Sequence, residues 1–129
     1  MKKNIKTDGA PAPVGAYNQA VVHDNTLYMS GQIALDPVTG ELMTGDLETE
    51  TRQVMENIKA ILEAAGLTFD HVLKVSVFVS DMKQYDRINA VYSEYFDEAA
   101  APARELIQVA ALPKFVNVEI SLVAASYSL

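Results

Sequence analysis

The sequence predicts an α+β protein in which two helices pack on one face of a single mixed β-sheet. Two segments near the N-terminus, 16–25 and 26–35, are rich in β-branched and aromatic residues, as strands are. Two further short apolar segments, 104–109 and 116–125, lie near the C-terminus. Between these pairs, two segments with helical spacing of apolar residues flank a segment with strand alternation, 73–80.

Length and composition favour one domain that spans residues 1–129. Half of the 129 residues are hydrophobic, and no run of Ser, Gly or Pro is long enough to form a linker. The net charge of -7 would repel nucleic acid and anionic lipid. The chain has no Cys, which excludes disulfides, thiolate nucleophiles and sulfur-ligated metals and suggests a reducing cytoplasm. No segment approaches the ~20 apolar residues that span a bilayer, so we expect a soluble protein.

The first two strands should form an antiparallel hairpin. Residues 23–25, His-Asp-Asn, have the polar character of a hairpin turn. The stretch 36–40 then contains the Pro and Gly that are typical of a turn.

The first helix should begin after Asp46, which is a plausible N-cap, and end before Gly66, which stands where a C′ glycine belongs. Its apolar positions recur at helical spacing: Leu47, Val54, Ile58, Ile61, Leu62 and Ala65.

The strand 73–80 alternates Leu73, Val75, Val77 and Val79 with Lys74, Ser76, Phe78 and Ser80. Asp81 and Gln84 then have the spacing of a capping box, which predicts a second helix that runs to about Phe96. The last two strands are parted by Pro113 and Lys114.

The predicted order is ββ, α, β, α, ββ. Right-handed crossovers would place both helices on the same face of the sheet. The last strand presents Val118, Ile120, Leu122 and Ala124 to that face. The opposite face combines charged, polar and apolar side chains, namely Lys74, Ser76, Phe78, Asn117, Glu119 and Ser121. This mixture is typical of a subunit interface that contains polar pockets, so we expect an oligomer.

Several kinds of active site are excluded by what the chain lacks. His23 lies in a predicted turn and His71 just before a strand, and neither has a carboxylate at ligand spacing, so we expect no metal site. The sequence contains no Gly-x-Ser-x-Gly motif, and no glycine-rich loop of the kind that binds nucleotide phosphates.

Arg104 and Glu119 lie within otherwise apolar segments, and two interpretations of them remain open. They could form a structural ion pair between neighbouring strands. Alternatively, Arg104 could bind a small carboxylate bidentately while Glu119 handles a proton. Tyr17 and the Ser30-Gly31-Gln32 segment lie where they could support such a pocket.

The sequence resembles the reactive intermediate deaminase family, also called RidA/YjgF or liver perchloric-acid-soluble protein. The resemblance covers nearly the whole chain. It is carried by "APAPVGAYNQAV", "LYMSGQIALDPVTGEL", "NIKAILEAAGLTFDHVLKVSVFVSDM", "INAVYSEYF" and, most specifically, "PAR" followed at the family's distance by "VEI".

This resemblance implies a chorismate-mutase-like fold assembled as a homotrimer, with a pocket at each subunit boundary. It implies hydrolysis of enamine and imine acids, such as 2-aminoacrylate, 2-iminopropanoate and 2-iminobutanoate, to 2-keto acids and ammonia without a cofactor. By similarity, Arg104 would bind the substrate carboxylate and Glu119 would activate water. Residues that match the lining of the family's pocket are Tyr17, Ser30, Gly31, Asn89 and Leu106.

Three positions depart from the family's usual pattern. Glu105 follows the arginine where a small residue is common, but strand alternation turns it away from Arg104. At Leu106, where Cys or Thr is frequent, any contact with the ligand would come from the backbone. "GAYNQ" replaces the common "GPYSQ", a change in loop stiffness more than in chemistry.

Two other functions remain open. The first is a non-catalytic or chaperone-like trimer that binds a small carboxylate in the same pocket. The second is a ribonuclease, an activity that has been attached to parts of the family and that the net charge of -7 disfavours.

Overall fold

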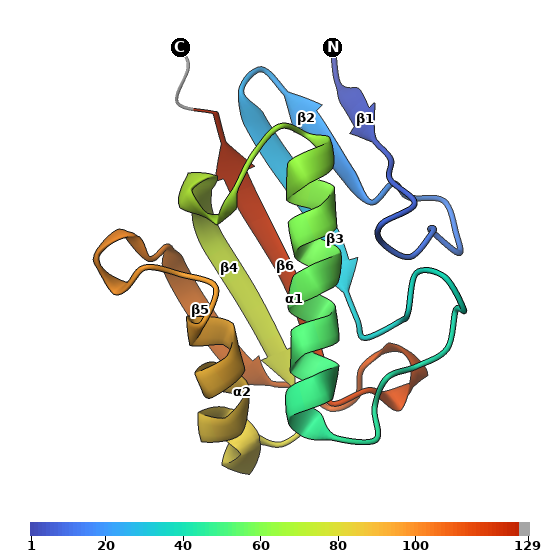
Figure 1. Cartoon of the computed structure of the whole chain (residues 1–129), viewed down its shortest axis with the longest axis vertical. Coiled ribbons are helices and arrows are strands. Elements are labelled where there is room, and N and C mark those ends of the chain that lie inside the picture. Colours follow the sequence, from blue (N-terminus) through green and yellow to red (C-terminus); the bar gives the residue numbers. More distant parts are fainter. Residues whose placement is uncertain (127–129) are drawn as a thin grey trace.

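The computed structural model describes residues 1–126. One six-stranded mixed sheet has the order β1-β2-β3-β6-β4-β5, and both helices lie on the same face of it (Figure 1). The predicted α+β fold class is therefore confirmed. The strands are β1 (Lys3–Ile5), β2 (Ala20–His23), β3 (Thr26–Gln32), β4 (Val72–Val79), β5 (Ala103–Gln108) and β6 (Val118–Ala125), and the helices are α1 (Leu47–Ala64) and α2 (Tyr85–Ser93).

The two crossovers explain why both helices share a face. β3 and β4 each pair antiparallel with β6, so they run in the same direction and α1 connects them across the sheet. β4 and β5 pair in parallel, and α2 forms that connection. Strand β1 was not predicted, because three residues are too few to show a period of two; it pairs with β2 through Lys3 and Val22.

The predicted hairpin is confirmed, although its strands are shorter than expected. Asp24 takes the turn with φ 54°, a left-handed conformation that Asp tolerates better than most residues. The segment 16–19 lies in a loop and not in β2. Gln19 stabilises this loop, because its buried amide accepts from Thr7 N (2.8 Å) and donates to the Pro11 carbonyl (2.9 Å).

Both predicted ends of α1 are confirmed. The Asp46 carboxylate accepts a hydrogen bond from Thr49 N at 3.0 Å. Gly66 follows the helix with φ 75°, which a residue with a side chain rarely adopts.

The second helix differs from the prediction at both ends. Asp81 caps a 3-10 turn, Met82–Gln84, and not α2 itself. Gln84 does not complete a capping box, since its buried Oε1 has no hydrogen-bond partner within residues 1–126. The helix ends at Ser93 and not at Phe96, because the following N–H groups bond to carbonyls three residues back and tighten the last turn.

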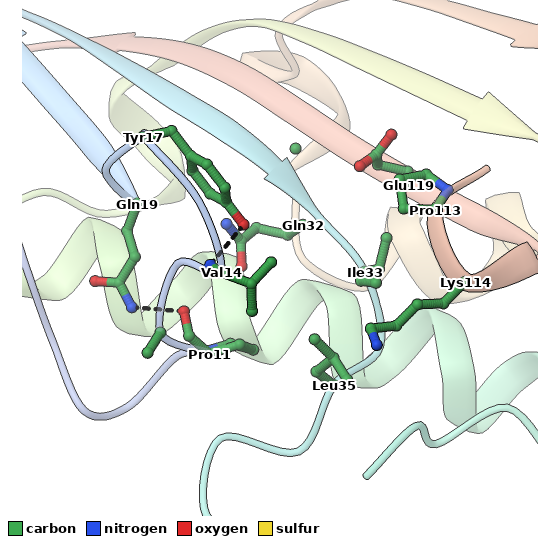
Figure 2. A pocket seen from close by; sticks show the side chains of 12 residues that line it. Pro11, Val14, Tyr17, Gln19, Gln32, Ile33, Leu35, Pro113, Lys114 and Glu119 are labelled. Carbon is green, nitrogen blue, oxygen red and sulfur yellow. Dashed lines mark hydrogen bonds between the residues drawn. The ribbon is translucent and has the colours of Figure 1, made fainter. Parts of the chain in front are cut away.

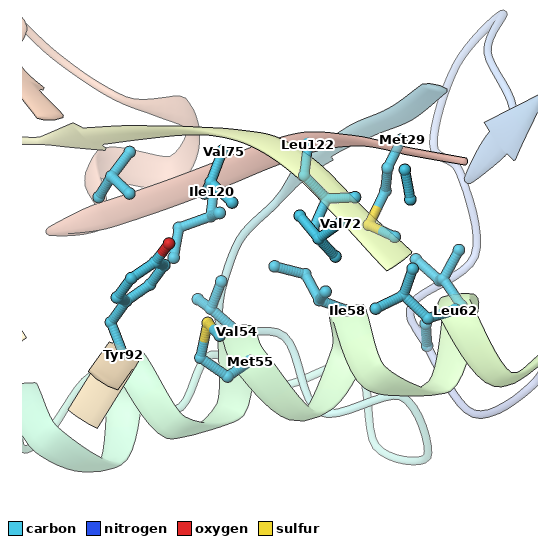
Figure 3. Packing of buried hydrophobic residues seen from close by; sticks show 14 of the residues in the cluster. Met29, Val54, Met55, Ile58, Leu62, Val72, Val75, Tyr92, Ile120 and Leu122 are labelled. Carbon is cyan, nitrogen blue, oxygen red and sulfur yellow. The ribbon is translucent and has the colours of Figure 1, made fainter. Parts of the chain in front are cut away.

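The hydrophobic core lies between the helices and the sheet, as Figure 3 shows. Val54, Met55, Ile58 and Leu62 of α1 meet Val72, Val75, Ile120 and Leu122 of the sheet, and Tyr92 contributes from α2. Leu73 was predicted to join this face but is 45% exposed. The register of β4 against β6 shifts between Val72 and Lys74, which turns Leu73 out of the core.

Neither α1 nor α2 covers the opposite face of the sheet (Figure 1). It carries Tyr28 and Ile107, which are 50% and 45% exposed, beside Ser76, Glu105 and Glu119. Asn117 was predicted to belong to this face, but β6 begins one residue later and the Asn117 side chain bonds to Glu50 of α1. Neither helix of the described chain is both long and apolar enough to cross a bilayer.

Candidate functional site

Glu119 lies on the uncovered face of the sheet, directly against Gly31. Side chains of β6 alternate, so Val118 and Ile120 are buried under the helices while Glu119 points the other way. The pairing of β3 with β6 is irregular between Met29 and Gln32, and this brings Gly31 beside the carboxyl group. A Cβ atom at position 31 would lie 2.7 Å from Glu119 Oε2. The missing side chain of Gly31 therefore makes room for the carboxyl group.

Glu119 and Gly31 line a cavity of about 120 Å³, together with Tyr17. Figure 2 shows Tyr17 of the N-terminal loop on one side and Glu119, Pro113 and Lys114 on the other. The remaining lining residues are Pro11, Ala12, Val14, Gln19, Gln32, Ile33 and Leu35. Three of the predicted site residues thus meet in one cavity that is mostly apolar.

The Glu119 carboxyl group is well placed to exchange a proton. It accepts no hydrogen bond from any group in residues 1–126. Burial raises the pKa of Glu119 above its ordinary value, because desolvation disfavours the charged form. A carboxyl group with a raised pKa can serve as both base and acid closer to neutral pH.

Tyr17 and Ser30 also bond to the N-terminal loop. The Tyr17 hydroxyl accepts from Val14 N at 3.3 Å, and half of the residue remains exposed. The Ser30 hydroxyl donates to the Asn18 carbonyl at 2.6 Å, and Ser30 N donates to the Gln19 carbonyl. Ser30 therefore holds the loop that carries Tyr17 against the end of β3.

Arg104 lies on the helix face of the sheet and is held by α2. Its two terminal nitrogens donate to Asn89 Oδ1 (2.7 Å) and to the Tyr85 hydroxyl (2.8 Å). The guanidinium also lies over the Tyr92 ring, 4.8 Å from the centroid, a favourable cation–π distance. Asn89, predicted from the resemblance, thus contacts Arg104 directly, whereas Tyr85 and Tyr92 were not predicted.

Arg104 and Glu119 do not meet within one chain. Strand β4 lies between β5 and β6, so the two residues are not on neighbouring strands. Arg104 pairs in register with the buried Val75 and points toward α2, whereas Glu119 points to the uncovered face. No ion pair joins Arg104 to a carboxylate within the described chain. The interpretation of a cross-strand ion pair is therefore wrong.

Glu105 and Leu106, which depart from the family's usual pattern, lie on opposite faces of the sheet. Glu105 bonds to Ser76 Oγ (2.8 Å) and to Lys74 Nζ (3.3 Å), and these contacts, Ser76 foremost, lower the pKa of Glu105. The predicted turn of Glu105 away from Arg104 is confirmed. Leu106 faces the same side as Arg104, with its side chain packed against the core.

Lys114 lines the cavity, although no pattern in the sequence predicted this. Pro113 and Lys114 were interpreted only as a turn, yet Lys114 and Phe115 both have φ 55°, a strained conformation for residues with long side chains. Within residues 1–126, no group of three or more His, Asp or Glu side chains could hold a metal ion.

The described chain thus carries Arg104 and Glu119 in two separate places, which we call the Arg104 half and the Glu119 half of the candidate site. The Arg104 half, built from β5 and α2, presents a fixed guanidinium that can bind a carboxylate. The Glu119 half, built from the N-terminal loop, β3 and β6, presents a carboxyl group in a small apolar cavity.

Comparison with known proteins gives concordant results. The family model described as Endoribonuclease L-PSP matches residues 7–126. A RutC family protein of Pyrococcus horikoshii is 50% identical, covering 96% of this chain and 98% of the relative. The 2-iminobutanoate/2-iminopropanoate deaminase of Rattus norvegicus is 44% identical, and the match covers 96% of this chain and 90% of the relative. The crystal structure of E. coli TdcF with bound serine superposes with a TM-score of 0.90 at 41% identity. The superposition covers 96% of this chain and 98% of the TdcF chain.

Proposed function

Because the chain belongs to the RidA/YjgF/L-PSP family, we propose that it hydrolyses reactive 2-imino acids, such as 2-iminopropanoate and 2-iminobutanoate, to 2-keto acids and ammonia. The observation that carries this proposal is the partly buried Glu119 carboxyl group, with its raised pKa and no hydrogen bond within residues 1–126, in a cavity that Gly31 keeps open. Relatives that bear the deaminase name over almost the whole chain support the same reaction.

The complete site forms between two subunits of a homotrimer. Arg104 and Glu119 point to opposite faces of one sheet, so a ligand can contact both only if a second copy supplies one of them. The uncovered face, with its half-exposed Tyr28 and Ile107, offers the surface on which that copy would pack. A contact between two different surfaces of the same chain can repeat around a closed ring, and a ring of three subunits is a common case.

Arg104 binds the carboxylate of the imino acid. The hydrogen bonds to Asn89 and Tyr85, with Tyr92 beneath the guanidinium, fix its orientation before the substrate arrives. A planar guanidinium held in this way binds a carboxylate bidentately and loses little entropy when it does so. The backbone beside Leu106 offers a further contact to the ligand, as its apolar side chain is turned into the core.

Glu119 moves the proton in hydrolysis. It accepts a proton from a water molecule as the oxygen bonds to the imine carbon, whose C=N electrons pass to nitrogen. Glu119 returns this proton to the nitrogen, which gives the neutral carbinolamine. Glu119 then accepts the hydroxyl proton and passes it to the amino group, so that the C–N bond breaks, ammonia leaves and the C=O bond forms. The imine carbon is already electrophilic, so the reaction needs no cofactor, and the raised pKa of Glu119 suits both transfers.

The apolar lining limits the size of the side chain that the substrate carries. Val14, Ile33 and Leu35 line a space of about 120 Å³, which suits short aliphatic groups. Tyr17 and Ser30 hold the edge of this space near the ligand. The reaction would take place in the reducing cytoplasm that the absence of cysteine suggests.

Ribonuclease activity, which the description of the family model names, is less well supported. A net charge of -7 opposes binding to a phosphate backbone, and the Glu119 cavity has only Lys114 as a cationic lining residue within residues 1–126. A protein that binds small carboxylates without turnover would use the same two halves of the site.

The test is imine hydrolysis with defined substrates. An amino-acid oxidase generates 2-iminopropanoate or 2-iminobutanoate in place, and semicarbazide traps what is not hydrolysed. The wild-type protein should divert the imine to ammonia and keto acid, and Arg104→Ala should abolish this effect. Saturable binding of the keto acid without faster hydrolysis would instead identify a binding protein.

A further inference from the structure

Glu50 carries a carboxylate that is completely buried, outside the cavity described above. It lies in the first turn of α1, at the end of the sheet where the chain enters β6 (Figure 1). A buried carboxylate is costly unless several donors replace the water it has lost. The donors around Glu50 therefore indicate its role in the structure.

Within residues 1–126, the Glu50 side chain accepts hydrogen bonds from Asn117, just before β6, and from Val118, its first residue. Oε2 accepts from Asn117 N (2.8 Å) and from Val118 N (3.2 Å), and Oε1 accepts from Asn117 Nδ2 (2.8 Å). Both oxygens thus act as acceptors, and the N-terminal end of α1 adds a favourable helix dipole. The carboxylate fixes two consecutive backbone N–H groups just before Glu119.

Asn117 is held from its other side by Ser80. The Asn117 carbonyl accepts from Ser80 N (3.0 Å), and its Oδ1 accepts from Ser80 Oγ (3.3 Å). The preceding residues, Lys114 and Phe115, both have φ 55°, a conformation that costs free energy and persists only when the flanking chain is anchored. Glu50 supplies that anchor from inside the domain.

Glu119 lacks a side-chain hydrogen bond within residues 1–126, so the backbone of β6 determines where its carboxyl group lies. We infer that Glu50 is a positioning residue for Glu119, which fixes the start of β6 so that the Glu119 carboxyl group stays against Gly31. This inference rests on the proposed function and adds a residue that touches neither the substrate nor the cavity.

The test compares three changes at position 50. Glu50→Asp keeps the charge but shortens the reach by one methylene, and Glu50→Ala removes the acceptors. Glu50→Gln should be tolerated: its amide oxygen can keep the backbone N–H bonds, while a flip of the Asn117 amide presents an acceptor to the new nitrogen and a donor to Ser80 Oγ. If Glu50→Gln keeps its activity and Glu50→Asp does not, loss of charge cannot explain the effect, because Gln lacks the charge and Asp keeps it.

Two controls separate positioning from general effects. Leu62→Ala destabilises the same helix at a buried position far along the chain from Glu50. Glu48→Gln alters another acid of the first turn, whose side chain is half-exposed and bonded to Arg87. Both variants should keep kcat within about 2-fold of wild type at temperatures where they are folded.

We expect Glu50→Ala and Glu50→Asp to lower kcat by about 10- to 100-fold, with KM changed by less than about 3-fold, while Glu50→Gln stays within about 3-fold of wild type. A folded Glu50→Asp with wild-type kcat, or an equal loss in Leu62→Ala, would overturn the inference. If Glu50→Ala does not fold, the kcat of Glu50→Asp still tests the inference. If the wild type itself shows no turnover, the proposed function fails, and a crystal structure of Glu50→Asp decides the inference: a displaced Glu119 supports it, an unmoved one contradicts it.

Discussion

Gly31→Ala is the change whose effect on the site follows most directly from the geometry. The new Cβ would lie 2.7 Å from Oε2 and 2.9 Å from Cδ of Glu119, whereas non-bonded atoms prefer about 3.5 Å. The carboxyl group must therefore move by roughly 0.5–1 Å, away from the position proposed above for activating water. A displacement of that size should lower kcat by about 10- to 100-fold.

Stability should change little in this variant. Gly31 does not have a positive φ, so alanine can adopt its backbone conformation. The smaller conformational entropy of the unfolded chain would stabilise the variant by about 0.4–1 kcal/mol. An off-rotamer Glu119 would cost about 0.5–1.5 kcal/mol, which nearly offsets that gain.

The assay is imine hydrolysis under the conditions described above, with thermal unfolding of the same samples. Gly45→Ala is the matched control, because a Cβ there meets nothing within 4 Å and φ is not positive. Combining Gly31→Ala with Glu119→Asp should cost less than the two single losses predict, because the shorter acid lacks the outermost atoms, which the new methyl group approaches most closely. Wild-type kcat in Gly31→Ala, or additive losses in the double variant, would show that Gly31 does not set the position of the Glu119 carboxyl group.

Two further predictions concern the acid and the arginine. Arg104→Lys should lose the bidentate contact, and a loss of about 2–3 kcal/mol would lower kcat/KM by roughly 30–150-fold in steady-state assays without a large change in Tm; full activity would contradict the role of Arg104. Glu119→Gln should lower kcat by about 100-fold. Because burial raises the folded-state pKa of Glu119, the ionised form destabilises the fold, so Glu119→Gln should unfold at an equal or higher temperature at pH 7, and this advantage should vanish below about pH 4. A lower Tm for Glu119→Gln at pH 7 would contradict that origin of the shift.

The fold could be predicted because local signals and global topology agree. The alternation of Val118, Ile120, Leu122 and Ala124 specified the buried face of β6 correctly, and Asp46 and Gly66 marked both ends of α1. Strand β1 and the outward turn of Leu73 could not be predicted. The first is too short to show a pattern, and the second depends on a register shift that only pairing with β6 reveals.

The candidate site was predicted less completely, since its residues come from distant parts of the chain. Alternation showed that Glu105 faces away from Arg104. It could not show that β4 separates β5 from β6, because the order of strands depends on how distant segments pair. The support of Glu119 that we infer for Glu50 joins residues 69 positions apart and acts through Asn117. An acid in the first turn of a helix is usually explained by the helix dipole alone.

Mixed trimers test whether Arg104 of one subunit and Glu119 of another complete each site, as we propose. Arg104→Ala and Glu119→Gln should each be inactive trimers by light scattering and kinetics. After the two variants are unfolded together and refolded in equal amounts, about a quarter of the subunit boundaries should carry both wild-type residues. Activity should therefore return to roughly that fraction of wild type. A mixture that forms trimers yet stays inactive would contradict it.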